Sequence, residues 1–128
     1  MNFLQGYLIL AGCFELLAIF QIHQKKDVSK VIPTGFLKED KIASTNDTVI
    51  FFTQIFLLIL TMTRFHCAMD IHSKSIYRLT IWIHILEGFL FVGFPILKKQ
   101  LNPKGYVISA AIVILPIWMS YSYKSYLY

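Results

Sequence analysis

Charged residues are scarce in this chain of 128 residues. Asp, Glu, Lys and Arg make up 15% of it, whereas apolar residues make up 56% and aromatic residues 16%. A soluble domain of this length needs more charge to cover its surface. The mean hydropathy of +0.60 points the same way. The composition therefore indicates an integral membrane protein.

The sequence also lacks the motifs of enzymes and metal proteins. Its six glycines form no phosphate-binding loop, and neither a nucleophile elbow nor HExxH occurs. Cys13 and Cys67 lack Cys-x-x-Cys spacing, so we expect them to pack between helices as small apolar side chains. The net charge of +5 is spread along the chain, which argues against nucleic acid as a partner. We expect no catalytic site, no cofactor and no bound metal.

Four long apolar stretches dominate what is present. They cover about residues 3–22, 48–63, 79–97 and 106–123, and about 20 apolar residues in a helix cross a bilayer. The second stretch reaches full length only if residues 46–48 and 64–67 extend it as helix. The sequence predicts an all-α integral membrane protein with one domain, residues 1–128, and four transmembrane helices in one small bundle.

The flanks of these stretches predict the topology. The first stretch begins without a basic segment or a small-residue cleavage pattern, so we expect a retained helix. Four spans place both termini on one side of the membrane. The connectors after the first and third spans are rich in lysine, which places them in the cytoplasm. Pro116, inside the fourth stretch, predicts a kink.

Three ionisable side chains fall inside the apolar stretches, namely Glu15, His84 and Glu87. His84 and Glu87 are three residues apart and share one helical face. A charge in the bilayer costs about 2.5–3.5 kcal/mol, so such groups normally face protein. Gly12, near Glu15, belongs to a small-residue face that lets another helix approach closely. We favour hydrogen bonds that hold helices together over a ligand site or the proton path of a carrier or channel.

A polar segment, RFHCAMDIHSKSIYRLTIW at residues 64–82, joins the second and third stretches. His66, Asp70 and His72 are conceivable metal ligands. The neighbouring arginines and lysine would repel a cation, however, and no metal motif accompanies them. We therefore favour a structural connector over a metal site.

The chemistry of this connector predicts specific contacts. We expect Asp70 to accept hydrogen bonds from Arg64 or Arg78 at the level of the lipid headgroups. We also expect it to accept from backbone amides at the start of the third helix, where a negative charge is favourable. Ser73 or Ser75 would cap that helix.

The same segment resembles the signature of the ergosterol biosynthetic protein 28 family. In that signature an Arg ends one span, and a small-residue pair and an Asp-Ile-His triplet follow. A Lys, a Tyr, a Thr and an aromatic residue then open the next span. The resemblance implies structural or partner-binding roles for Arg64, Asp70, His72, Lys74, Tyr77, Thr80 and Trp82.

The resemblance implies that the chain acts as a tether, that is, a protein that holds other membrane proteins together. Members of that family are small four-span proteins of the endoplasmic reticulum membrane that hold the sterol C4-demethylation enzymes together without a catalytic site. The resemblance implies a non-catalytic scaffold whose partners are other integral membrane proteins in a hetero-oligomeric complex, and lipids. The alternative, suggested by the Lys-, Ile-, Phe- and Tyr-rich composition, is an accessory subunit of an energy-transducing complex in the mitochondrial inner membrane.

Overall fold

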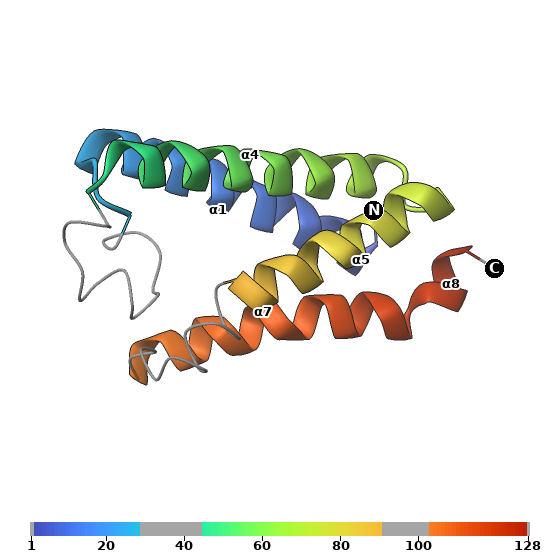
Figure 1. The fold of residues 1–128 in the computed structure, drawn as a ribbon. Helices are drawn as coiled ribbons and strands as arrows, with labels where there is room; N and C mark the ends of the chain where they lie inside the picture. Colours follow the sequence, from blue (N-terminus) through green and yellow to red (C-terminus); the bar gives the residue numbers. More distant parts are fainter. Residues whose placement is uncertain (1, 29–44, 91–102, 128) are drawn as a thin grey trace.

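The computed structural model describes residues 2–28, 45–90 and 103–127 (Figure 1). Within these ranges the chain forms helices and no strand, which confirms the all-α class. The long helices run alternately in opposite directions, so the two termini lie at the same end of the molecule (Figure 1). The helices are α1 (Phe3–Lys25), α4 (Asp47–Met69), α5 (Lys74–Gly88), α7 (Pro103–Tyr121) and the short α8 (Tyr123–Leu127).

Each predicted span overlaps one long helix. α4 continues past the predicted residue 63 to Met69, through the residues that its length required. Residues 91–97 of the third predicted span lie outside the described residues. In the described part of the chain, two helices, α1 and α4, are long and apolar enough to cross a membrane. Ile112–Tyr121, which belongs to α7, forms a shorter apolar helical stretch. The number of four spans stays a prediction.

Side-chain caps fix where three of the helices begin. Asn2 Oδ1 accepts from the Gln5 amide at 2.9 Å, and Gln5 Oε1 accepts from the Asn2 amide at 3.0 Å. This capping box starts α1. Asn46 Oδ1 caps α4 by accepting from the amides of Thr48 and Val49 at 2.9 and 3.3 Å. Ser73 Oγ accepts from the Ile76 amide at 3.5 Å to cap α5. The helix starts are therefore encoded locally.

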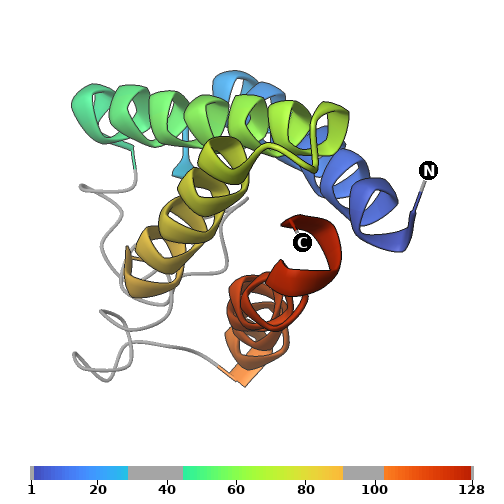
Figure 2. The ribbon, with the colours of Figure 1, turned by 90° about the vertical axis from the view of Figure 1, so that its right-hand side faces the viewer.

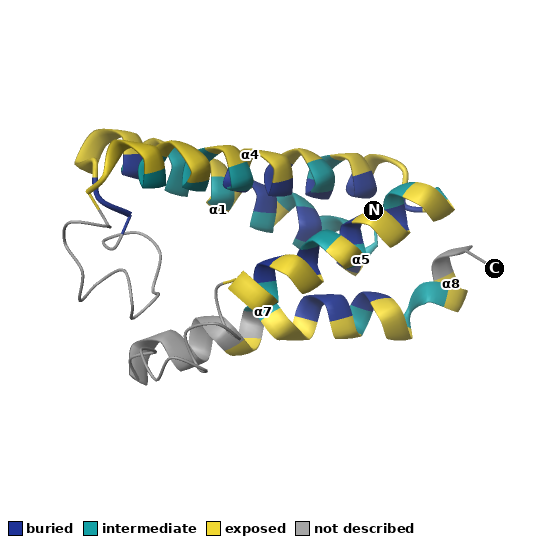
Figure 3. Cartoon of the chain, viewed as in Figure 1, coloured by how far each residue is buried: buried dark blue, intermediate teal, exposed yellow. Residues whose placement is uncertain are grey.

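Many large apolar side chains are exposed and several polar side chains are buried. Figure 3 shows where exposed and buried residues lie on the helices. Phe14 on α1 is 63% exposed and Trp82 on α5 is 69% exposed. By contrast, Arg64, His84 and Glu87 are at most 5% exposed. Water would disfavour this distribution, whereas the acyl chains of a bilayer cover apolar helix faces and force polar groups inward.

The main core joins all four long helices. Trp118 on α7 packs against the rings of Phe3 and Tyr7 on α1, with centroid distances of 5.5 and 5.7 Å. Figure 2 views α7 nearly end-on while α4 runs across the picture, so these two helices cross at an angle instead of lying parallel. The core comprises Leu4, Leu8, Cys67, Ala68, Ile71, Tyr77, Leu115 and Met119.

The two cysteines are free and differ in environment. Cys67 is buried in the main core, as predicted, but Cys13 is exposed on the outer face of α1. The predicted packing is therefore wrong for Cys13, because its neighbour Gly12 takes the position that faces α4. α7 continues as helix through Pro116, and the kink expected there stays a prediction.

α1 and α4 pack closely along their length. Gln5 Nε2 donates to the Ala68 carbonyl at 2.8 Å, and Gln54 Nε2 donates to the Ile19 carbonyl at 3.3 Å. Between these contacts, a Cβ built at Gly12 would overlap the ring of Phe65. The predicted close approach at the small-residue face is confirmed.

We expect Gly12→Val to lower the free energy of unfolding by about 1–3 kcal/mol, because the added side chain overpacks the contact with Phe65. Thermal unfolding in mild detergent measures this loss. Gly88→Ala is the control, since no described residue lies within 4 Å of a Cβ built at Gly88. The double variant Gly12→Val, Phe65→Leu should recover part of the loss. A Gly12→Val protein as stable as the wild type would contradict the close contact.

Candidate functional site

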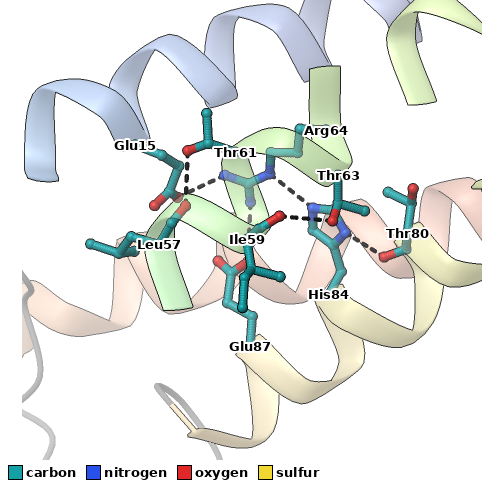
Figure 4. Close-up of polar contacts among 9 residues, drawn as sticks. All are labelled: Glu15, Leu57, Ile59, Thr61, Thr63, Arg64, Thr80, His84 and Glu87. Atoms are coloured by element: carbon teal, nitrogen blue, oxygen red, sulfur yellow. Dashed lines mark hydrogen bonds and ion pairs between the residues drawn. The ribbon is translucent and has the colours of Figure 1, made fainter. Parts of the chain in front are cut away.

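Arg64 of α4 extends into the bundle and binds groups on two other helices (Figure 4). Its Nη1 donates to Glu15 Oε1 of α1 at 2.7 Å, and its Nη2 donates to Glu87 Oε2 of α5 at 3.1 Å. Its Nε donates to His84 Nε2 of α5 at 2.9 Å. Each guanidinium nitrogen has a partner, so one side chain connects α1, α4 and α5.

His84 is held in one tautomer by its two neighbours. Its Nε2 accepts the hydrogen bond from Arg64 and therefore carries no proton. Its Nδ1 lies 2.6 Å from the Thr80 carbonyl oxygen, which can only accept, so Nδ1 carries the proton and donates. His84 is neutral in this arrangement, with both ring nitrogens engaged.

The charges of this network do not cancel when both acids are ionised. One guanidinium faces two carboxyl groups, which leaves one negative charge, and protonation of either acid would make the network neutral. The side chains of Arg64, Glu15 and Glu87 are 6%, 17% and 4% exposed. Burial of each ion costs several kcal/mol and is offset only by a full set of hydrogen bonds. The hydrogen bonds of Arg64 to α1 and α5 therefore favour the interpretation that these buried groups hold the helices together.

The predicted pairing of Asp70 with Arg64 or Arg78 is wrong. Arg64 binds Glu15, His84 and Glu87 instead, and Arg78 Nε donates to the Tyr123 hydroxyl at 2.8 Å. The N-terminal cap of α5 is Ser73, one of the two serines predicted for this role. Helical side chains lean toward the helix N-terminus, so Arg64 points into the bundle and away from the headgroups, whereas Asp70 follows the last turn of α4 and is exposed.

The segment of residues 64–82 divides into a buried and an exposed face. Tyr77 and Thr80 are fully buried, and the Tyr77 hydroxyl donates to the Met119 carbonyl at 2.7 Å, which ties α5 to α7. The buried face of the segment therefore stabilises the packing of the helices. The exposed members of the signature are Asp70, His72, Lys74 and Trp82.

The metal alternative has no geometric support in the described ranges. There, no three His, Cys, Asp or Glu side chains are grouped so that they could hold a metal ion. His66, one of the conceivable ligands, is exposed, and its Nδ1 lies 2.8 Å from the Met62 carbonyl of its own helix. His72 is exposed as well.

The sequence identified Glu15, His84 and Glu87 as buried polar groups. It predicted that Asp70 would pair with Arg64, their actual cation, or with Arg78. The informative signal was the length of the second apolar stretch, which required residues 64–67 to be helical. An arginine in a membrane-spanning helix needs an acidic partner. Glu15 and Glu87 were the acids inside other apolar stretches, so this reasoning would have paired them with Arg64.

We expect Arg64→Met to lower the free energy of unfolding by about 3–5 kcal/mol, because it leaves two buried carboxyl groups without their cation. Thermal unfolding in mild detergent tests this. The triple variant Arg64→Met, Glu15→Gln, Glu87→Gln should recover part of the loss. Arg78→Met, at an exposed position, should cost less than about 1 kcal/mol. Equal losses in the two single arginine variants would contradict the network.

Comparison with known proteins identifies the family. The profile of a family described as "Erg28 like protein" matches residues 4–119, a range that includes every member of the Arg64 network. No curated protein and no solved structure matches the chain significantly. The apolar surface agrees with a membrane protein. The chain therefore belongs to the Erg28-like family, a family of membrane proteins of sterol biosynthesis.

Proposed function

We propose that this chain is a non-catalytic scaffold that holds the enzymes of sterol C4-demethylation together in the endoplasmic reticulum membrane. The family match over residues 4–119 carries this proposal. The same match gives no support to the alternative of a mitochondrial accessory subunit. Cell fractionation separates the two, since exclusive residence with respiratory markers would exclude the sterol role.

The buried polar groups suit a scaffold because they fix the relative positions of the helices. Arg64 connects α1, α4 and α5, and the bond from Tyr77 to the Met119 carbonyl connects α5 to α7. A preorganised surface binds partners with less loss of conformational entropy than a mobile one. The potential acid and base groups of the interior thus serve the shape of the molecule.

We place the partner contact on the exposed face of α5 and on the adjoining α8. Trp82 is 69% exposed, and Leu79, one turn before it, is 54% exposed. Near the end of this face, Arg78 lies over the ring of Tyr123, with 5.5 Å between Cζ and the ring centroid. Trp, Tyr and Arg contribute most of the binding energy in many interfaces. The apolar surroundings of Trp82 favour integral membrane proteins as partners.

The test uses a sterol-producing host cell without its own family member. We expect this cell to accumulate C4-methylated sterols and the wild-type chain to reverse the accumulation. Affinity purification in mild detergent should recover a methyl oxidase and a short-chain dehydrogenase. Recovery of the chain alone, as a monomer, would contradict the scaffold.

The surface assignment has its own variant pair. Trp82→Ala should weaken partner binding by about thirtyfold or more, since truncation of an interface hot spot costs at least about 2 kcal/mol, and should leave thermal stability unchanged. Phe14→Ala removes an aromatic ring with similar exposure, 63%, from α1 and should retain the partners. Equal effects of the two variants on partner recovery would contradict a contact centred on Trp82.

A further inference from the structure

A groove with a volume of about 640 Å³ lies between α5 and α7. Its walls include Ile85 and Gly88 from α5 and Pro116, Ile117 and Ser120 from α7. Ile85 and Ile117 are 47% and 62% exposed, so the groove opens on the outer surface of the helices. In a membrane protein, this surface contacts lipid.

The chemistry of the lining selects an uncharged, mainly apolar ligand. Among the lining residues that the structure describes, none carries a formal charge, because His84, which also borders the groove, is neutral and both its ring nitrogens are engaged. A phosphate or carboxylate group would therefore find no cationic partner among these described lining residues. The volume lies within the range of about 300–1,000 Å³ that is typical of small-molecule sites.

Gly88 adds to the open space of the groove, because it has no side chain. Glycine is a poor helix former, and at Gly12 the overlap with Phe65 explains it. At Gly88 nothing in the described part of the chain lies within 4 Å of a built Cβ, so no contact among the described residues accounts for a glycine there. The missing side chain leaves room for a molecule that is not part of the chain.

One end of the groove is polar. Ser120 and Tyr121 border it near the C-terminal end of α7. The Ser120 hydroxyl donates its proton to the Pro116 carbonyl at 2.7 Å, and its oxygen can still accept a hydrogen bond from a ligand hydroxyl. Val113 and Gly88, which also line the groove, are apolar.

We propose that the groove between α5 and α7 binds a sterol, with the ring-A hydroxyl at Ser120 and the ring system against Gly88. The identity of the ligand rests on the proposed function, because a scaffold of sterol enzymes works beside their substrates. A rigid ring system also loses less conformational entropy on binding than a flexible acyl chain. The single hydroxyl of a sterol matches the one polar end of the groove.

The test uses the full-length protein in phosphatidylcholine vesicles that contain a photoreactive sterol with a diazirine on ring B and a free ring-A hydroxyl. Peptide mapping should locate the label on α5 and α7, and excess unlabelled sterol should remove it. Gly88→Leu should reduce labelling by at least about tenfold, since one extra methylene in a filled apolar pocket already has an effect of this size. Ser120→Ala should reduce it by about fivefold through the loss of one hydrogen bond.

Cys13→Leu is the matched control, because it adds an apolar side chain at an exposed position on α1, and labelling should stay at the wild-type level. Thermal unfolding verifies that Gly88→Leu folds, and Gly88→Ala, which fills less space, should give an intermediate loss. Labelling spread evenly over the lipid-facing helices and unaffected by Gly88→Leu would overturn the proposal. So would equal labelling of the groove by a photoreactive phosphatidylcholine, which would identify an acyl chain as the occupant.

Partner recovery from the host cell keeps this inference separate from the scaffold function. Specific labelling without recovery of the two enzymes would support the sterol groove and contradict the scaffold. Recovery of the enzymes together with unspecific labelling would contradict the groove alone.

Discussion

The position of one buried cation organises this molecule. Arg64 cannot be left without acceptors in a membrane interior, and its fork of donors requires acceptors in fixed directions. Glu15, His84 and Glu87 meet this requirement from two other helices. The rotation of α1, α4 and α5 about their own axes is therefore tied to a single guanidinium group. Apolar packing between lipid-covered helices has no comparable directional preference.

The same residue types would suggest acid–base chemistry in an enzyme, but here their side chains hydrogen-bond one another. His84 uses both ring nitrogens, one toward Arg64 and one toward the Thr80 carbonyl. Glu15 and Glu87 each accept a hydrogen bond from the guanidinium of Arg64. A buried ion pair adds little net stability, yet it penalises every alternative packing that would leave a charge alone. That property suits a scaffold whose surfaces must keep their relative positions.

α5 concentrates the features that connect this fold to function. One face carries His84 and Glu87 toward Arg64, and Tyr77 hydrogen-bonds α7. Trp82 lies on the exposed side, and Gly88 borders the groove. Partner binding and sterol binding, as proposed here, would both act on a helix that the buried network holds in place.

The sequence alone determined the helical class, the approximate helix positions and the family signature, because apolar length, caps such as Ser73 and short motifs are local properties of a chain. It also showed that Glu15, His84 and Glu87 need partners, because burial of a charge is costly wherever it occurs. Only the tertiary structure decided that Arg64 pairs with Glu15 and Glu87 and not with Asp70, since a residue separation of 49 between Arg64 and Glu15 says nothing about helix rotation or register. The groove beside Gly88 likewise depends on how α5 and α7 pack against each other, a relation between two helices that neither sequence contains by itself.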